Sequence, residues 1–461
     1  MLILRLLDKH KQRKSSKLVT QIKDEGVQLN NPDEISNAFR KHYANLFIPI
    51  KNSNYDDVFK AEIVNTSNLE VVEHDTSTPE YKILNSEISF NEIEEACKNL
   101  KTGKAPGHDG IVNEHIKYGG EVVFQYLHIL YNLMLKSGHT PHSFKLGIIV
   151  PILKEGKPKH KLSSYRPVSL LPVLSKIFET IVKNRIEQLQ NVHSIPFPNL
   201  QQNGYQKHLG SITVSFNLQE TILYNRELGS DTYVAFLDAS SAFDHVWHAG
   251  LFCKLKALGI CGPALNVIID SYDEISGQVV VNGVTSSSFP VLQGIRQGGV
   301  LSSWLYLLYI NDLLNELENS KLGSNIGALQ TGNPTLADDL TLVANNLSNL
   351  TAMVEIVYKY ATKWRFAYNE SKCTVIKFTN PTRAPHNPIQ LGSFNLTQSK
   401  SVKHVVIHVH LSEALSKSLT IEKRCQKGSN CLFSILATDD SRFFLNTTVI
   451  KYLVEKEINL S

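Results

Sequence analysis

Three aspartates stand at positions where a carboxylate is a poor structural choice. Asp238 follows the apolar run Tyr233–Leu237, which predicts a short buried strand. Asp338 and Asp339 interrupt the apolar stretch Thr335–Val343, which predicts a hairpin with both aspartates at or near its tip. Aspartate is disfavoured in strands, and an Asp-Asp pair makes a poorer turn than Asn-Gly. These three side chains are therefore the first candidates for chemistry.

Divalent cations explain why carboxylates would be kept so close together. Neighbouring carboxylates raise one another's pKa, and a bound cation relieves that repulsion. Mg²⁺ prefers oxygen ligands and keeps positions for water and substrate phosphates. Two ions about 4 Å apart can stabilise the attacking and leaving oxygens of a phosphoryl transfer. We therefore expect Asp238, Asp338 and Asp339 to hold two Mg²⁺ ions, with Mn²⁺ as the alternative metal, although an Asp-Asp pair alone is a weak signal.

The composition is that of a globular chain with more than one subdomain. The chain has 461 residues, of which 42% are hydrophobic and 20% charged, and this length exceeds what one hydrophobic core supports. The formal net charge of +4 permits a nucleic-acid partner without requiring one. The basic runs Lys9–Lys17 and Lys154–Lys161 are either solvated faces or phosphate contacts.

Cysteine usage and hydropathy indicate the cellular compartment of the protein. The six cysteines are scattered without a CxxC pair, so neither a disulfide framework nor a zinc ribbon is expected. The apolar run after Met1 is too short for a signal peptide, and no run has the length of a membrane span. We expect an intracellular protein of the nucleus or cytoplasm, without a membrane partner.

Hydrophobic periodicity and turn signals place further elements. Residues 1–50 are expected to be helical, and residues 51–85 to form a polar linker. Strands and helices alternate irregularly, which favours the α+β class. The other expected elements are a capped helix at Ser89–Leu100, a helix at 121–136, a strand at Gly147–Leu153, a helix after Tyr165-Arg166-Pro167 and a hairpin that turns at Asn282-Gly283.

Six ordered sequence blocks resemble one known family. The blocks are KAPGHDG at 104–110, YRPVSLL at 165–171, FLDASSAFDHVWH at 236–248, QGIRQGGVLS at 293–302, LYINDL at 308–313 and ADDL at 337–340. In this order and spacing, the chain resembles the reverse transcriptases of non-LTR (LINE-type) retrotransposons, and the jockey-like elements most of all. The resemblance covers about residue 20 to about residue 410.

The resemblance implies an RNA-directed DNA polymerase of a mobile element. Such an enzyme uses two-metal phosphoryl transfer to add deoxynucleotides to a primer, so its partners are an RNA template, a DNA primer and deoxynucleoside triphosphates. The implied fold is a right-hand polymerase with an antiparallel palm sheet. The expected regions are an N-terminal helical extension and linker at 1–85, fingers and finger–palm connections at 86–230, the palm at 231–405 and a truncated thumb at 406–461, with the reverse transcriptase domain at about 135–405.

The resemblance also assigns the catalytic and sugar-selecting positions. Asp238 matches the first metal-binding aspartate, and Asp338 and Asp339 match the paired ones. Phe243 matches the bulky residue that would clash with a 2′-hydroxyl and so select deoxynucleotides.

Five further positions match residues that contact the incoming nucleotide. Lys154 and Arg166 match finger residues that grip the triphosphate, and an arginine can make paired bonds to phosphate oxygens. Gln293 and Gly294 match a segment packed under the nucleotide and template. Lys372 matches a lysine that protonates the leaving pyrophosphate. Each cation also has a plainer reading, since Lys154 and Lys372 can be solvated surface residues and Arg166 can cap the next helix.

Four departures from the family pattern leave the activity open. Leu336 stands where an aromatic residue is usual, Ser303 replaces a proline, Gly204-Tyr205-Gln206 replaces Gly-Phe-Arg, and Val405-Val406 replaces a Leu-Gly turn. We expect a partial copy that lacks the endonuclease domain. An inactive relic that at most binds nucleic acid is the alternative, and a related intron or viral polymerase is a third reading.

A histidine-rich run near the C-terminal end carries little weight as a metal site. His404, His408 and His410 would share one face of a single strand, but no carboxylate or cysteine lies in the same run.

Overall fold

The computed structural model divides the chain into two compact units, residues 1–398 and 399–461. The structure describes residues 19–49, 51–69, 75–193, 197–378, 388–404 and 407–410. In the second unit, β17 (Ser401–His404) pairs antiparallel with β18 (Ile407–His410). The histidine run is therefore a hairpin, and the expectation of one continuous strand was wrong. The expected thumb, at 406–461, falls largely outside the described residues.

A five-stranded sheet in the order β11-β12-β5-β13-β16 forms one half of the first unit. Its central strand, β5, is buried along almost its whole length, as its apolar sequence predicts. Neighbouring strands run antiparallel except at the edge, where β16 lies parallel to β13. The strands are β11 (Thr335–Leu336), β12 (Asp339–Ala344), β5 (Thr232–Asp238), β13 (Thr374–Phe378) and β16 (Thr397–Gln398).

Helices α10 (Ser211–Glu227) and α14 (Leu347–Lys363) pack on this sheet. The long helix α13 (Ser302–Asn319) is buried on nearly all sides and contacts α14 and α11 (His248–Ala257). Two short hairpins lie in the same half, β9 (Asn325–Ile326) with β10 (Leu329–Gln330) and β14 (Gln390–Leu391) with β15 (Phe394–Asn395).

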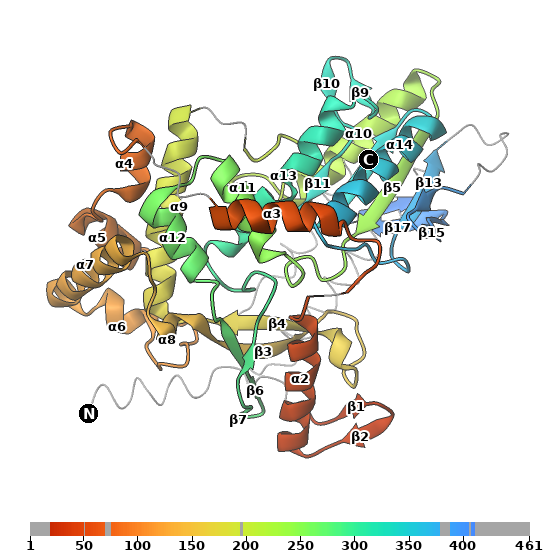
Figure 1. The fold of residues 1–461 in the computed structure, drawn as a ribbon. Coiled ribbons are helices and arrows are strands. Elements are labelled where there is room, and N and C mark those ends of the chain that lie inside the picture. Colours follow the sequence, from red (N-terminus) through yellow and green to blue (C-terminus); the bar gives the residue numbers. More distant parts are fainter. Residues whose placement is uncertain are drawn as a thin grey trace, which may run out of the picture. The chain divides into compact units, whose positions relative to one another are not determined.

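A second sheet, in the order β4-β3-β6-β7, forms the other half (Figure 1). The strand expected near Gly147–Leu153 is confirmed as β3, and the expected Asn282-Gly283 turn joins β6 to β7. Both turn residues have positive φ, 53° and 82°, as a tight hairpin turn requires. The strands are β3 (Leu146–Leu153), β4 (Tyr165–Leu170), β6 (Ser276–Val281), β7 (Val284–Thr285) and β8 (Phe289–Pro290), which pairs with β6.

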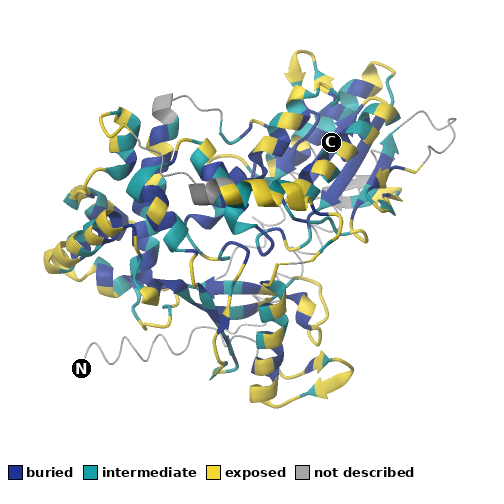
Figure 2. Ribbon diagram, viewed as in Figure 1, coloured by how far each residue is buried: buried dark blue, intermediate teal, exposed yellow. Residues whose placement is uncertain are grey.

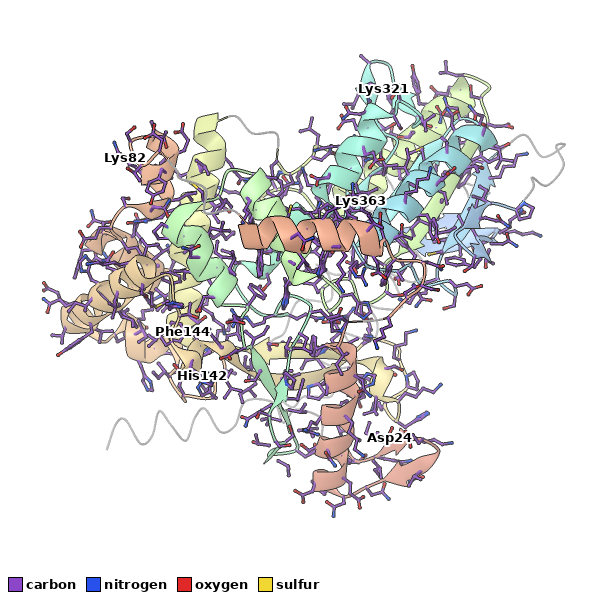
Figure 3. The ribbon with its side chains drawn as sticks, viewed as in Figure 1. Asp24, Lys82, His142, Phe144, Lys321 and Lys363 are labelled. Atoms are coloured by element: carbon purple, nitrogen blue, oxygen red, sulfur yellow. The ribbon has the colours of Figure 1, made fainter. Side chains whose placement is uncertain are left out.

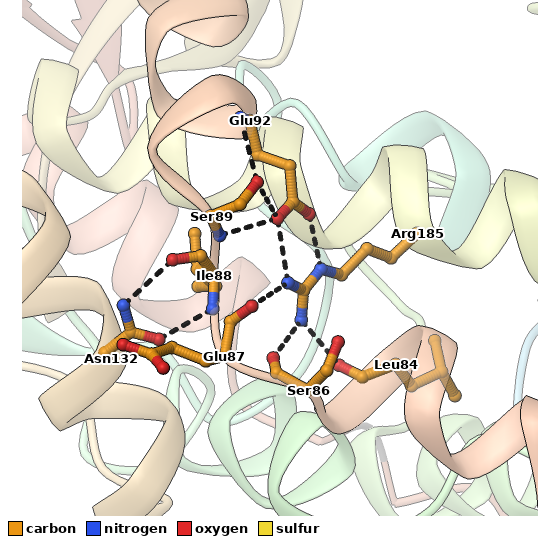
Figure 4. Close-up of polar contacts among 8 residues, drawn as sticks. All are labelled: Leu84, Ser86, Glu87, Ile88, Ser89, Glu92, Asn132 and Arg185. Carbon is orange, nitrogen blue, oxygen red and sulfur yellow. Dashed lines mark hydrogen bonds and ion pairs between the residues drawn. The ribbon is translucent and has the colours of Figure 1, made fainter.

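A layer of helices packs around α9 (Val173–His193). The expected helix at Ser89–Leu100 is confirmed as α5 (Phe90–Lys98), and its N-terminal Ser89 and Glu92 form the predicted capping box. Glu92 also binds the buried Arg185 guanidinium of α9 through N–O distances of 2.6 and 2.9 Å (Figure 4). The layer also contains α4 (Pro79–Asn85), α6 (Asn113–Lys117), α7 (Gly120–Ser137) and α12 (Gly262–Asp270). Two short segments lie outside it: α8 (His142–Lys145), which contacts β3, and the 3₁₀ turn η1 (Leu162–Ser164), which precedes β4.

The N-terminal region differs from its expected structure. Within the stretch expected to be helical, β1 (Ile22–Asp24) and β2 (Val27–Leu29) form a hairpin before α2 (Pro32–Leu46). The expected linker contains α4 and also α3 (Asp57–Leu69), so it is not one long loop. Helix α3 is held by tertiary contacts rather than by its own polar sequence. The Phe59 ring meets Trp364 edge-on at 5.2 Å, and Lys363 lies 4.4 Å from the Phe59 ring centroid (Figure 3).

Helix α2 packs against the second sheet, and its residues join a separate hydrophobic core there. Phe39 meets Tyr165 edge-on at 5.0 Å, and Phe47 stacks on Phe289 at 6.4 Å. Among the described helices, none is long and apolar enough to cross a membrane.

Candidate active site

The three aspartates come together at the end of the first sheet. Asp238 and Asp339 are direct partners in the antiparallel register of β5 and β12. Leu336 pairs with Asp339, so Ala337 and Asp338 form the two-residue turn of the predicted hairpin. The expected position of both aspartates at the hairpin tip is confirmed.

A buried glutamine fixes the hairpin turn. The Gln202 side chain is 1% exposed, and its oxygen accepts hydrogen bonds from the backbone N–H groups of Ala337 at 2.8 Å and Gly204 at 2.7 Å. Ala337 has φ +56°, a left-handed conformation that disfavours residues with a Cβ. Gly204 packs so closely on the Ala337 backbone that a side chain there would collide with it. The conformation of the turn therefore depends on residues about 135 positions away in sequence.

The electrostatics of the aspartates show an excess of negative charge. Burial, together with the neighbouring Asp338 and Asp238 carboxylates, raises the pKa of Asp339 to about 6. Partial burial and the Asp238 carboxylate also raise the pKa of Asp338, although this side chain still reaches solvent. Carboxylates that raise one another's pKa are stabilised by a nearby cation.

Lys372 provides a cation at this site. Its Nζ lies 2.6 Å from Oδ2 of Asp238, and the two side chains are 50% and 30% exposed. The backbone N–H of Asn369 donates to the Asp238 carbonyl at 2.8 Å, which ties the Lys372 loop to the end of β5.

The donor set fits Mg²⁺ in its chemistry, since it consists of carboxylate oxygens in a partly buried, electronegative setting. Among the described residues, however, no three acidic, His or Cys side chains are already arranged around a common metal position. The strand register still brings Asp238 and Asp339 side by side, with Asp338 in the adjoining turn, and a bound cation would stabilise carboxylates whose pKa values are raised in this way. The Lys372 contact also holds Asp238 in its present orientation.

Two further cations lie near the site: Arg166 acts electrostatically on Asp338, and Lys154 lies within electrostatic reach of Arg166 and Lys372. Lys154 follows β3, and its Nζ donates to the Ser163 carbonyl at 3.0 Å. Partial burial lowers the pKa of Lys154, and the neighbouring cations Arg166 and Lys372 lower it further. Arg166 is exposed near the start of β4, opposite Ile152. Helix α9 begins only at Val173, so the reading of Arg166 as a helix cap was wrong.

Phe243 belongs to a group of three aromatic rings beside the aspartates. It stacks on Tyr306 with ring centroids 4.6 Å apart and an interplanar angle of 15°. Tyr205 meets Phe243 edge-on at 6.0 Å and is 61% exposed. Partial burial and the Asp338 carboxylate raise the pKa of Tyr205, whereas Arg166 lowers it. Tyr205 thus contacts Phe243 and lies within electrostatic reach of Asp338 in the hairpin turn and of Arg166.

Gln293 and Gly294 lie in a loop that packs against the segment around Phe243, since the backbone N–H of Ile295 donates to the Phe243 carbonyl at 2.8 Å. The Gln293 side chain is buried, and its amide donates to the carbonyls of Leu46 and Ile48 at 3.0 Å each. Gly294 has φ +86°, and a Cβ there would lie 2.6 Å from the Asp244 carbonyl oxygen. Glycine is therefore required where this loop packs against the segment that follows Phe243.

Asp244 is a buried carboxyl. Its side chain accepts a hydrogen bond from Gln297 at 2.7 Å, and burial raises its pKa to about 7. Gln202, Tyr205, Asp244 and Gln297 were not assigned any site role from the sequence. Asp244 and Gln297 stand within the quoted sequence blocks and Tyr205 within a departure from the family pattern, but Gln202 had no local signal because its contacts join distant segments.

Comparisons with known proteins show which family this chain resembles over most of its length. A family model described as reverse transcriptase (RNA-dependent DNA polymerase) matches residues 154–409. RNA-directed DNA polymerases from mobile element jockey are 31% identical over 347 residues in Drosophila funebris and over 349 residues in Drosophila melanogaster. A probable RNA-directed DNA polymerase from transposon X-element of Drosophila melanogaster is 28% identical over 335 residues. The alignments cover 71–73% of this chain but 36% of each relative, so the chain spans about a third of their length.

Proposed function

This chain belongs to the reverse transcriptase family, and from that membership we propose that it adds deoxynucleotides to a DNA primer on an RNA template. The resemblance drawn from the sequence blocks is confirmed. Family membership implies a right-hand polymerase fold. The observation that carries the proposed activity is the pairing of Asp238 with Asp339 across two strands, with Asp338 in the adjoining turn.

The two sheets support an assignment of the polymerase regions. We assign the fingers and their connections to 86–230, the palm to 231–405 and a truncated thumb to 406–461. The sheet that carries the aspartates is then the palm sheet. Strand β6 of the palm segment pairs with β3 of the fingers segment, so the two regions share the second sheet.

We assign different roles in phosphoryl transfer to the three aspartates and to the two cations of the second sheet. Asp238, Asp338 and Asp339 would hold two Mg²⁺ ions, which supply positive charge to the attacking and leaving oxygens when bound. Lys154 and Arg166 approach from the second sheet and bind the triphosphate of the incoming nucleotide. Cations so placed stabilise negative charge that develops on the phosphates.

The aromatic group and Lys372 complete the assignment. Phe243 excludes the 2′-hydroxyl, with Tyr306 behind its ring and Tyr205 at its edge. Gln293 and Gly294 belong to the segment that packs against the bound nucleotide and template. Lys372 protonates the pyrophosphate, a role supported by its half-exposed amine beside Asp238. We place the reaction inside the cell, in the nucleus or cytoplasm.

Primer extension tests this function. Purified protein with an RNA template, a DNA primer, deoxynucleotides and Mg²⁺ should extend the primer. Asp338→Asn should abolish extension, whereas the matched control Asp273→Asn, at an exposed position away from the site, should not. Salt-dependent RNA binding by the wild-type protein without any extension would refute the enzyme proposal and support the inactive relic.

A further inference from the structure

Helix α7 carries a stripe of large apolar side chains on its outer face. Val122, Tyr126, Ile129 and Leu133 are each between 61% and 71% exposed. Their spacing of 4, 3 and 4 residues places them along one line on the helix. The opposite face packs into the core through Phe124, Leu127, Tyr131, Met134 and Leu135. Figure 2 shows the exposed turns of α7 in yellow at the left of the view.

The exposed charged residues of α7 stand only at the two ends of the helix. Glu121 and Lys136 are exposed, and the exposed residues between them are uncharged. A nucleic acid would need cations on the surface that it contacts. A membrane surface would favour basic residues along the polar flank of such a helix. Contiguous apolar patches on soluble proteins more often mark a contact with another protein surface.

We propose that this stripe is a self-association surface, on which α7 of a second copy of the chain packs antiparallel. A two-fold axis near the middle of the helix would set Tyr126 against Ile129 of the partner subunit. It would also set Val122 against Leu133 of the partner subunit. A surface that contacts its own copy in this way closes as a dimer.

Charge complementarity selects the antiparallel direction. Antiparallel packing brings Glu121 beside Lys136 of the partner subunit, and the two-fold axis repeats this contact at the other end. Parallel packing would instead oppose like charges at both ends. The helix macrodipoles also favour the antiparallel arrangement, and the 4-3-4 spacing is that of a helix-pair seam.

The surface is small, so the dimer should be weak. One helix pair of this length buries less than the roughly 1,200 Å² at which stable interfaces begin. Association should therefore depend on protein concentration rather than be permanent.

Sedimentation velocity of the nuclease-treated, full-length protein over a concentration series tests the surface. The wild-type protein should shift from monomer to dimer mass, and Ile129→Lys should stay monomeric over the same range. Ile129 is 64% exposed, so its replacement leaves the core intact, which a thermal melt checks. The control Ile212→Lys, at a 75% exposed position on α10, should dimerise like the wild type. A monomeric wild type, or a dimeric Ile129→Lys variant, would overturn the proposal.

Charge exchange tests the direction of packing. Glu121→Lys and Lys136→Glu each place two repulsive contacts in the dimer and should raise its dissociation constant about tenfold. The double variant restores opposite charges at both ends and should return the constant to near the wild-type value. A double variant as weak as either single variant would refute antiparallel packing. Because the readout is mass, the result does not depend on polymerase activity.

Discussion

Replacing Phe243 with valine should remove most of the discrimination between deoxynucleotides and ribonucleotides. The selectivity of a steric gate depends on how firmly its ring is held. The Phe243 ring lies 4.6 Å from the ring of Tyr306, which is 3% exposed and cannot give way. The Tyr205 ring meets the Phe243 ring edge-on, with the two ring centroids 6.0 Å apart. A 2′-hydroxyl that reaches this position therefore meets a ring that has little room to move.

The size of the effect follows from two penalties. Forcing an extra atom against a packed side chain costs about 1–3 kcal/mol. Burying the hydroxyl against an aromatic face without a hydrogen-bond partner costs about another 1–3 kcal/mol. Together they correspond to a selectivity between about 30-fold and about 10⁴-fold in kcat/KM. Valine removes the ring and with it both penalties, so the ratio for Phe243→Val should fall below about tenfold.

Single-nucleotide primer extension on an RNA template measures this ratio directly. The kcat/KM for a deoxynucleotide should change little in Phe243→Val, whereas that for the matching ribonucleotide should rise. Phe252→Val is the control, because it removes another partly buried ring, which stacks on His248. Equal use of both sugars by the wild type, or an unchanged ratio in Phe243→Val, would refute the gate.

Three other predictions concern the surroundings of the site. Gln202→Leu should lower the free energy of unfolding by about 2–5 kcal/mol in urea titrations, because two buried backbone N–H groups, including that of Ala337, lose their acceptor. An unchanged urea midpoint would show that Gln202 does not stabilise the turn. Without metal, Asp339→Asn should stabilise the protein by about 1–3 kcal/mol at pH 7.5, which lies above the raised pKa of about 6. This gain in stability should disappear near pH 4, where the Asp339 carboxyl of the wild type is protonated. A gain that does not change with pH in thermal melts would argue against charge repulsion. Arg185→Leu should cost about 3–5 kcal/mol, since it leaves the Glu92 carboxylate half-buried without its partner, and an additional Glu92→Gln change should recover part of that loss.

The three candidate aspartates could be found from the sequence because a carboxylate conflicts with the apolar sequence around it. A carboxylate at the end of a buried strand, as at Asp238, is visible without any knowledge of the fold. The capping box of Ser89 and Glu92 was predictable for a related reason, since both partners lie within one helical turn. The pairing of Asp238 with Asp339 needed the register of two strands about 100 residues apart, which a single sequence does not determine.

The residues that hold the site in place were not predictable in this way. Gln202 has an ordinary polar sequence around it, and its role appears only where it meets the Ala337 turn. Helix α3 was read as part of a linker because its sequence is polar. Its order depends instead on Phe59 and on Arg365, which binds Asp57 at 2.9 Å. Long-range contacts override local propensity in both cases.

The hairpin turn at Ala337 and Asp338 must stay rigid although it carries closely spaced negative charges. The strand register brings Asp238 and Asp339 together, but their repulsion would push an unsupported turn outward. Gln202 opposes this movement from the buried side, and Lys372 offsets part of the charge from the solvent side. Replacing either support should therefore affect the aspartates differently: loss of Gln202 moves the turn, whereas loss of Lys372 leaves the turn in place and increases the demand for a bound cation.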